Sequence, residues 1–364
     1  MSTQSNNSYI KYSWFLMGMV FLVILAGGVV RMTQSGMGCP DWPRCFGMWI
    51  PPTDASQLPA DFEKYLSKQD IDHSFNVYHT WIEYINRLLG ALLGVFIFIY
   101  ALWTAVRFSD RKPRMKQLLL ACLGVAVSLV IFGSLGAMSL LKVFALMFVG
   151  VALYSMYFAV RHSDRRSMVI VAILLLIAVA IQGYLGKIVV DENLNVVKIT
   201  IHMVGALVIA ALPLINISKL STAKIGVPGI VRHGTTALII IVLMQIVLGT
   251  QVREEIDAIS KSLSYQNREL WIERLSEIFL VHRSFSWLVV LGSVGIWYKS
   301  KNSSRFRMMA KMLLAVLAVI ILLGIVMSYL DMPAVAQPLH LLLACALLMQ
   351  LFYMRLQLRN EDKI

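Results

Sequence analysis

Long apolar segments alternate with polar ones from residue 13 to residue 356 of the chain. A helix needs about 20 consecutive apolar residues to cross the hydrocarbon core of a bilayer, whereas a helix on a soluble domain keeps a polar face. By that length, the chain predicts ten membrane-spanning helices, at roughly 13–32, 79–106, 117–138, 141–160, 167–187, 197–217, 230–251, 276–298, 308–329 and 335–356. We therefore expect an all-α polytopic membrane protein.

Two of the polar segments between the spans are long, at residues 33–77 and 252–275. The second contains WIERLSE, from Trp271 to Glu277, which predicts an amphipathic helix on the membrane surface. The other connecting segments are too short to form a soluble domain. Any functional site must therefore lie within the helix bundle or at its outer surface.

Composition and the placement of charges agree with a membrane protein. The 364 residues are 58% hydrophobic and 15% charged, whereas a soluble domain has about 45–50% apolar and about 25% charged residues. The net charge is +13. Most of the basic residues lie in the N-terminal segment and in every second connecting segment, which the spans place on the same side of the membrane, and these segments hold few acidic residues. The positive-inside rule predicts that both termini are cytoplasmic, and the charge indicates contact with anionic lipid rather than nucleic acid.

A weak internal repeat relates the first part of the chain to the last. The first span ends in AGGVVRMTQ and the seventh in VLGTQVREE. The second span carries Asn86 and Arg87 at the depth where the eighth carries His282 and Arg283. Both copies begin on the same side of the membrane, so the repeat predicts two parallel copies related by an axis along the membrane normal.

The repeat continues in the spans that follow. The fifth span carries QGYLGKIVV before His202, and the ninth carries LLGIVMSYL before His340. We therefore expect two pseudo-symmetric four-helix bundles, a first half at residues 1–217 and a second half at residues 218–364. The spans within 117–160 have no counterpart and predict an extra helical hairpin in the first half.

Three histidines lie near the outer ends of apolar helices at repeat-related depths, namely His202, His282 and His340. A single histidine in a membrane helix is often a hydrogen-bonding residue between helices. Imidazole is also an axial ligand of haem iron, and helix bundles build haem sites from facing helices. His282 and His340, in the same half, predict one haem held from both sides, an arrangement that suits electron transfer.

The first half breaks this symmetry, because Asn86 occupies the position of His282. An asparagine is a poor iron ligand, so a haem there would be held by His202 alone or by another residue. His79 lies two turns earlier on the same helix face, about 10 Å nearer the outside. An open coordination position suits binding or oxygen chemistry better than simple electron transfer.

The second span also has a polar face, made by His79, Glu83, Asn86 and Arg87 at spacings of three and four residues. A carboxylate at membrane depth costs several kcal/mol unless it is paired, protonated or hydrated. One interpretation is a set of interfacial polar anchors at a helix end. The other, which we favour, is a buried polar site in which Glu83 relays protons or stabilises a cationic intermediate.

Four arginines recur at the outer ends of helices in both halves: Arg31, Arg87, Arg253 and Arg283. Their guanidinium groups match the bidentate geometry of haem propionates. The alternative is that each side chain extends to the membrane interface without a specific partner.

Cys39 and Cys45 frame the sequence GCPDWPRC in the first outer loop. In an oxidising compartment this spacing predicts a small disulfide ring. A redox-active thiol pair is the alternative, and a zinc site is not expected because no second ligand pair is near.

Taken together, these motifs resemble the haem A synthase family of integral membrane proteins. The matching stretches are GGVVRMTQSGMGCPDWPRC, IEYINRLLG, QGYLGKIVV with IHMVGALV, LGTQVRE, HRSFSW and LHLLLA, within roughly 13–106 and 167–356. The resemblance implies an enzyme that oxidises a methyl group of haem O to a formyl group, giving haem A for cytochrome c oxidase. A cysteine pair in the family's first outer loop matches Cys39 and Cys45.

The resemblance also implies a division of labour between the halves. The second half would hold haem b as a cofactor between the histidines that match His282 and His340. The first half would bind haem O as substrate, with a histidine that matches His202 and a glutamate that matches Glu83 as catalytic residues.

The chain departs from the family pattern in two ways. The family commonly has Glu-x-x-His-Arg on the second helix, whereas this chain has Asn86 at the histidine position. The family commonly has eight spans, and the hairpin at 117–160 would make ten. We therefore expect His202, or a residue not yet identified, to hold the substrate haem.

This interpretation predicts an enzyme of a bacterial-type inner membrane, with its active sites toward the outer face. A quinol is the expected electron donor and a haem O synthase the expected source of substrate; the oligomeric state stays open, a homo-oligomer included. Two other functions remain. A membrane cytochrome b that carries electrons without modifying haem is weakened by the missing fourth histidine. A transporter with internal repeats is disfavoured because the polar residues cluster at the outer ends of the spans.

Overall fold

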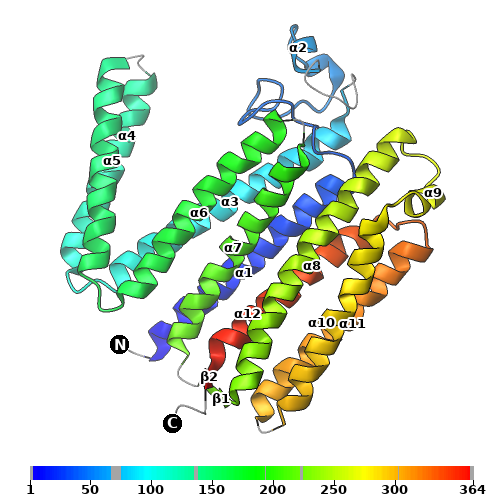
Figure 1. Cartoon of the computed structure of the whole chain (residues 1–364). Coiled ribbons are helices and arrows are strands. Elements are labelled where there is room, and N and C mark those ends of the chain that lie inside the picture. Colours follow the sequence, from blue (N-terminus) through cyan, green and yellow to red (C-terminus); the bar gives the residue numbers. More distant parts are fainter. Residues whose placement is uncertain are drawn as a thin grey trace.

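The chain folds into long helices that run side by side, seen in a computed structural model that describes residues 3–66, 75–134, 138–192, 194–221, 224–301 and 303–360 (Figure 1). The long helices are α1 (Thr3–Met32), α3 (Val77–Arg107), α4 (Lys112–Ser134), α5 (Met138–Arg161), α6 (Arg166–Asp191), α7 (Val196–Leu220), α8 (Gly229–Ser262), α10 (Glu277–Lys299), α11 (Ser304–Tyr329) and α12 (Ala336–Gln357). Short elements complete the described chain: η1 (Ala55–Gln57), α2 (Glu63–Leu66), α9 (Glu269–Glu273), β1 (Ile225–Val227) and β2 (Leu358–Asn360).

Nine of the long helices are, within the described residues, long and apolar enough to cross a membrane. The tenth, α4, begins with three basic residues in five positions, Lys112, Arg114 and Lys116, which shorten its apolar part. The prediction of an all-α polytopic membrane protein is confirmed, and the protein is an integral, multi-pass membrane protein. The first residues of α1 and the β2 strand lie at the same end of the bundle (Figure 1).

Eight of the long helices pack as two groups of four. In the first group, α1 and α6 each pack against both α3 and α7, so α3 and α7 lie diagonally opposite each other. In the second group, α8 and α11 each pack against both α10 and α12, so α10 and α12 are the diagonal pair. The order of the helices along the chain is the same in both groups, as the parallel repeat predicts.

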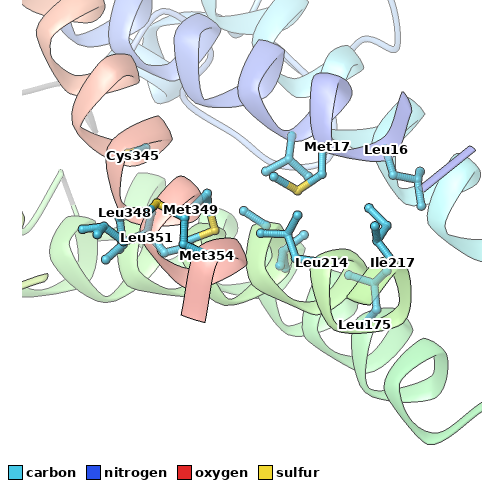
Figure 2. Close-up of a cluster of buried hydrophobic side chains, with 14 of the residues drawn as sticks. Leu16, Met17, Leu175, Leu214, Ile217, Cys345, Leu348, Met349, Leu351 and Met354 are labelled. Carbon is cyan, nitrogen blue, oxygen red and sulfur yellow. The ribbon is translucent and has the colours of Figure 1, made fainter. Parts of the chain in front are cut away.

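The two groups meet along α1, α7, α8 and α12. Apolar side chains fill this contact, among them Met17 of α1, Leu214 of α7 and Met354 of α12, all buried (Figure 2). The segment between α7 and α8 is tied to the segment after α12 by the parallel pairing of β1 with β2, in which Gly226 lies opposite Arg359. The contact fixes the position of each group relative to the other.

The hairpin of α4 and α5 stands to one side of the eight helices (Figure 1). Its two helices pack mainly against each other and reach the first group through α3 and α6. At its base, the Asp110 N–H donates to the His162 carbonyl and the Asp164 N–H donates to the Phe108 carbonyl, each at 3.0 Å. The hairpin is therefore joined to the bundle by a short two-stranded neck, and the four-helix packing of the first group does not depend on it.

The outer segment predicted at 252–275 is partly wrong. α8 continues to Ser262 instead of ending near residue 251, and an ion pair between Arg253 and Asp257, four residues apart, lies in the added turns. The predicted surface helix is the single short helix α9, and its Trp271 is buried rather than exposed to a membrane surface.

A buried polar cluster connects the helices of the first group at the end that holds the chain termini. The Asn216 amide of α7 donates to the hydroxyls of Tyr9 (3.3 Å) and Tyr100 (3.1 Å) and to the Met168 carbonyl (3.2 Å). The Tyr9 and Thr104 hydroxyls bond each other at 2.9 Å. Because none of these groups can reach water, each depends on the others for hydrogen bonds.

We predict that Asn216→Ala lowers the melting temperature of the purified protein in detergent by several degrees. The substitution removes the three hydrogen bonds that the Asn216 amide donates to buried partners, at a cost of about 1–3 kcal/mol. Ser128→Ala is the matched control, since the Ser128 hydroxyl bonds only a carbonyl of its own helix in α4, that of Gly124. Equal melting temperatures for the two variants would contradict a stabilising role for the cluster.

Candidate functional site

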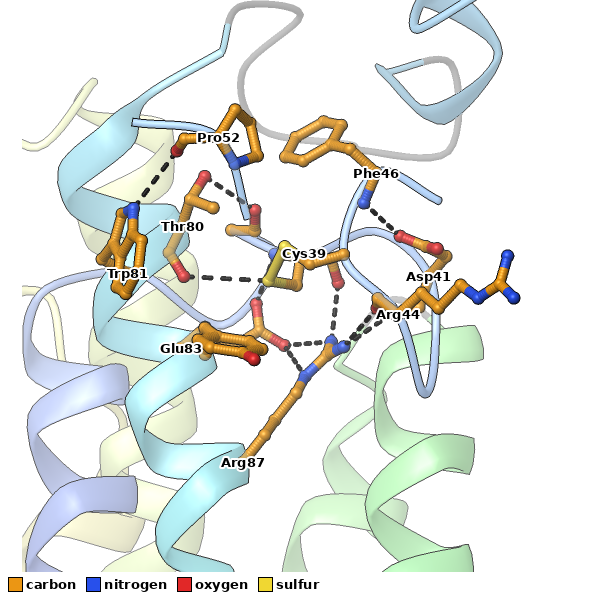
Figure 3. Close-up of a disulfide and its surroundings, with 12 residues drawn as sticks. Cys39, Asp41, Arg44, Phe46, Pro52, Thr80, Trp81, Glu83 and Arg87 are labelled. Atoms are coloured by element: carbon orange, nitrogen blue, oxygen red, sulfur yellow. Dashed lines mark hydrogen bonds and ion pairs between the residues drawn. A yellow bond between two sulfur atoms is a disulfide. The ribbon is translucent and has the colours of Figure 1, made fainter. Parts of the chain in front are cut away.

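A disulfide joins Cys39 and Cys45 in the loop that follows α1, with their Cα atoms 4.8 Å apart. The predicted disulfide is thus confirmed, and both cysteines are fully buried. The Asp41 carboxylate, within the ring that the disulfide closes, accepts hydrogen bonds from the N–H groups of Phe46 (2.6 Å) and Gly47 (3.0 Å), which follow the ring. This disulfide loop lies on the N-terminal part of α3 (Figure 3).

Glu83 of α3 lies under the disulfide loop and is 3% exposed. One carboxylate oxygen, Oε2, accepts a hydrogen bond from the Cys39 backbone N–H at 2.7 Å. The other, Oε1, accepts from Nε of Arg87 at 3.1 Å and from its Nη2. The charge is therefore paired and hydrogen-bonded at both oxygens, which offsets the cost of burying it.

The Arg87 guanidinium joins α3 to the loop. Besides Glu83, it donates to three loop carbonyls, those of Cys39 (2.7 Å), Asp41 (2.6 Å) and Arg44 (3.1 Å) (Figure 3). These bonds and the two to Glu83 use all five N–H groups of the guanidinium. The geometry is at odds with the prediction that Arg87 binds a haem propionate, because no N–H is left for one.

Three further residues of α3 hold the loop, and sequence reasoning did not identify them. The Thr80 hydroxyl donates to the Gly38 carbonyl at 3.0 Å, the Trp81 indole to the Pro52 carbonyl at 3.2 Å and the Tyr84 hydroxyl to the Trp49 carbonyl. Thr80, Tyr84 and Arg87 are four and three residues apart, so they lie on one face of α3. This spacing is the feature of the sequence that could have identified them.

Two other contacts show how closely the loop approaches α3. A Cβ atom at Gly38 would lie 2.3 Å from the His79 carbonyl oxygen, so only glycine allows this approach. The His79 Nδ1 lies 3.2 Å from the Gln34 carbonyl, to which it donates. His79 is therefore held at the outer end of α3, on the loop side.

The three predicted haem-ligating histidines lie on α7, α10 and α12, and each packs its ring against a glycine of a neighbouring helix. The pairs, with the distance from the position of a glycine Cβ to the histidine Cε1, are His202 with Gly186 (3.4 Å), His282 with Gly249 (3.1 Å) and His340 with Gly324 (3.5 Å). Larger residues at these glycines would displace the rings. The glycines therefore belong to the site, although sequence reasoning treated them only as parts of the repeat.

The ring nitrogens of the second-group histidines fit metal ligation. His340 Nδ1 donates to the Ile320 carbonyl at 3.0 Å, which leaves its Nε2 as the unprotonated nitrogen. His282 Nδ1 is buried without a hydrogen-bond partner among the described residues. The two imidazoles, on diagonal helices, lie within range of electrostatic interaction with each other. Two histidines on the diagonal helices of one four-helix group are a ligand set that fits a haem.

The first group fits a haem on one side only. His202 Nδ1 is buried without a partner among the described residues, and its backbone carbonyl accepts a 2.6 Å bond from the Gln182 amide. In the second group, the Gln245 amide of α8 donates a 2.9 Å bond to the His282 carbonyl of α10. On the diagonal partner of α7, however, the position of the second ligand is held by Asn86.

The other three predicted propionate ligands differ from one another. Arg31 Nε and Arg253 Nη2 both approach the Asp257 carboxylate at 2.8 Å, so this pair links α1 to α8 at the outer side of the contact between the groups. Arg283 is exposed. Arg283 is the arginine most available for a propionate, and for Arg31 and Arg253 that role stays a prediction.

Comparison with known proteins gives one family. Residues 11–142 and 139–352 match the family described as cytochrome oxidase assembly protein, COX15-CtaA. The similar proteins include heme A synthases from Shewanella oneidensis (29% identical, over 31% of this chain and 33% of the relative), Rhodospirillum centenum (34%, over 26% and 27%) and Beijerinckia indica (33%, over 30% and 33%). Each of these alignments spans about a third of the relative or less.

We predict that Arg87→Gln speeds reduction of the Cys39–Cys45 disulfide by dithiothreitol about tenfold or more. Losing the charged bonds to the loop and to Glu83 lowers the cost of local opening by at least about 1.4 kcal/mol, and the disulfide is buried until the loop opens. The rate is measured by trapping the free thiols with a maleimide and weighing the protein.

The matched control for this test is Arg44→Gln, because the exposed Arg44 side chain lies against the Gly47 carbonyl, at 3.4 Å, and the Trp49 ring, both in the loop itself rather than on α3. This variant should reduce at the rate of the unmodified protein. If Arg87→Gln also reduces at that rate, Arg87 does not hold the loop closed.

Proposed function

Because the chain belongs to the cytochrome oxidase assembly protein family, we propose that it is a haem A synthase, which oxidises a methyl group of haem O to a formyl group. The observation that carries this proposal is the set of three histidines on the diagonal helices of the two groups, each packed against a glycine at a repeat-related position. Their buried ring nitrogens suit iron and lie where two haems fit, one in each four-helix group.

The second group supplies the cofactor site in this proposal. His282 and His340 hold haem b from both sides, and the bond from His340 to the Ile320 carbonyl orients that imidazole and sets its tautomer. Arg283, exposed and next to His282, contacts a propionate. When bound, this haem would supply one-electron transfer.

The first group supplies the substrate site. His202 holds the iron of haem O from α7, with its backbone fixed by the Gln182 amide. Glu83 lies one helical turn outward from Asn86 and keeps a negative charge there, because Arg87 and the Cys39 N–H bond its two oxygens. That charge stabilises positive charge that develops on the substrate. The disulfide loop covers Glu83 and keeps water away from it.

The orientation of the protein follows from its charges. Both termini are cytoplasmic, so the disulfide loop and the three histidines face the outer side of the membrane. The Arg31–Asp257–Arg253 cluster lies between the two groups at the same outer level.

A haem O synthase supplies the substrate. Dioxygen is the oxidant: two successive hydroxylations of the methyl group each place one oxygen atom on the carbon, and a quinol supplies the two electrons and two protons that turn the other oxygen atom into water. Loss of water from the resulting hydrated aldehyde leaves the formyl group.

The proposed reaction is tested by expressing the chain beside a haem O synthase, extracting the haems and identifying them by mass. We expect haem A or its alcohol precursor, in amounts that depend on Glu83. Glu83→Gln should abolish conversion while the haem of the second group is retained, because the amide carries no charge. Unchanged haem O in the unmodified protein would support an electron-carrying cytochrome b instead.

We predict that His282→Ala and His340→Ala each remove the low-spin haem b signal from the visible spectrum of the purified protein. His233→Ala is the matched control, since His233 is exposed near the inner end of α8. If the low-spin signal persists in both variants, the cofactor site is elsewhere.

A further inference from the structure

The repeat shows which residues of the first group correspond to Gly249 and His282 of the second. Aligning Arg31 with Arg253 places Gly27 of α1 at the position of Gly249 of α8. Aligning Arg87 with Arg283 places Asn86 at the position of His282. The contact between Gly249 and His282 in the second group therefore corresponds to Gly27 and Asn86 in the first.

These two corresponding positions differ in what fills them. A Cβ at Gly249 would lie 3.1 Å from the His282 ring, whereas no heavy atom of the described residues lies within 4 Å of the same point at Gly27. The shorter Asn86 side chain thus does not reach the point beside Gly27 that corresponds to the one the His282 ring approaches in the second group. Its amide oxygen is buried and has no hydrogen-bond partner among the described residues.

The nearest potential ligands on the same face of α3 are both engaged. His79 donates to the Gln34 carbonyl and lies seven residues, about 10 Å, outward from Asn86. Glu83 has both carboxylate oxygens bonded, to the Cys39 N–H and to Arg87. Neither side chain replaces the ligand that the repeat predicts at position 86.

We propose that Asn86 and the open space at Gly27 leave one axial face of the first-group haem free of any protein ligand. This face takes a small exogenous ligand, with the unpaired Asn86 amide as its hydrogen-bond partner, and the second group, closed by His282 and His340, takes none. The inference rests on the proposed function only in assuming that the first group holds a haem opposite His202.

Carbon monoxide tests this proposal without measuring methyl oxidation. The protein is purified after expression beside a haem O synthase, reduced with dithionite and titrated with carbon monoxide while its visible spectrum is recorded. We expect one of the two haems per chain to bind the ligand, and His202→Ala to remove that haem. No binding at either haem would overturn the proposal.

A matched pair of substitutions exchanges the residues at the corresponding positions of the two groups, Asn86 and His282. Asn86→His should convert the first-group haem to a low-spin spectrum and weaken carbon monoxide binding at least tenfold, because the imidazole fills the space at Gly27. His282→Asn should create a second carbon monoxide-binding haem. An unchanged spectrum and unchanged binding in Asn86→His would show that another group occupies this face.

A second pair of substitutions keeps the test decisive if Asn86→His fails to fold. Gly27→Leu should weaken carbon monoxide binding at least tenfold without changing haem content. Gly18→Leu is its control, because Gly18 of the same helix is exposed and, among the described residues, also has no heavy atom within 4 Å of its Cβ position. Equal affinities in the two variants would contradict the open face.

The outcomes separate this inference from the proposed reaction. Carbon monoxide binding that Asn86→His removes, in a protein that leaves haem O unchanged, would support the open face and refute the reaction. Haem A production by a protein that binds no carbon monoxide would support the reaction and refute the open face. A protein that holds only the low-spin haem of the second group, and no haem that His202→Ala removes, would refute both.

Discussion

The ionised pair of Glu83 and Arg87 is the interaction on which the outer part of the first four-helix group depends. A carboxylate buried at the end of a membrane helix has to be paired and hydrogen-bonded. Arg87 supplies the opposite charge, and the Cys39 N–H bonds the remaining oxygen. Because the same guanidinium also bonds three carbonyls of the disulfide loop, the loop, the disulfide and the carboxylate form one unit.

Arg283, the residue of the second group that corresponds to Arg87, differs from Arg87 in what surrounds its side chain. Arg283 follows His282 as Arg87 follows Asn86, yet Arg283 is exposed while Arg87 is occupied by the loop. One copy of the repeat therefore keeps its arginine available for a ligand, and the other uses it to hold a charged, covered site. The two groups share a scaffold and differ in chemistry at the same depth.

The helices, the extra hairpin and the disulfide could be predicted from the sequence because each depends on local information. Apolar length sets the spans, and the spacing of Cys39 and Cys45 sets the disulfide. The C-terminal end of α8 was predicted too early because the last turns of this helix are polar, and a polar segment in the sequence resembles a loop. The structure shows that these turns are helical and that Arg253 and Asp257 pair within them.

The partners of the arginines could not be predicted from the sequence. Arg87 binds carbonyls more than forty positions earlier in the chain, and Arg31 binds Asp257 of the other group. Such choices depend on how the loop and the two groups pack. The histidines stood out in the sequence because the repeat sets them at one depth. The glycines that pack against their rings did not stand out, because only the structure shows which glycines lie beside a histidine.

The most direct test of this account is an experimental structure of the protein purified with haem O and haem b. It should show one haem in each four-helix group, with the second-group iron between His282 and His340. The first-group iron should be bound by His202 on one side and face Asn86 on the other. A protein side chain on that second face, or a first group without haem, would contradict the account.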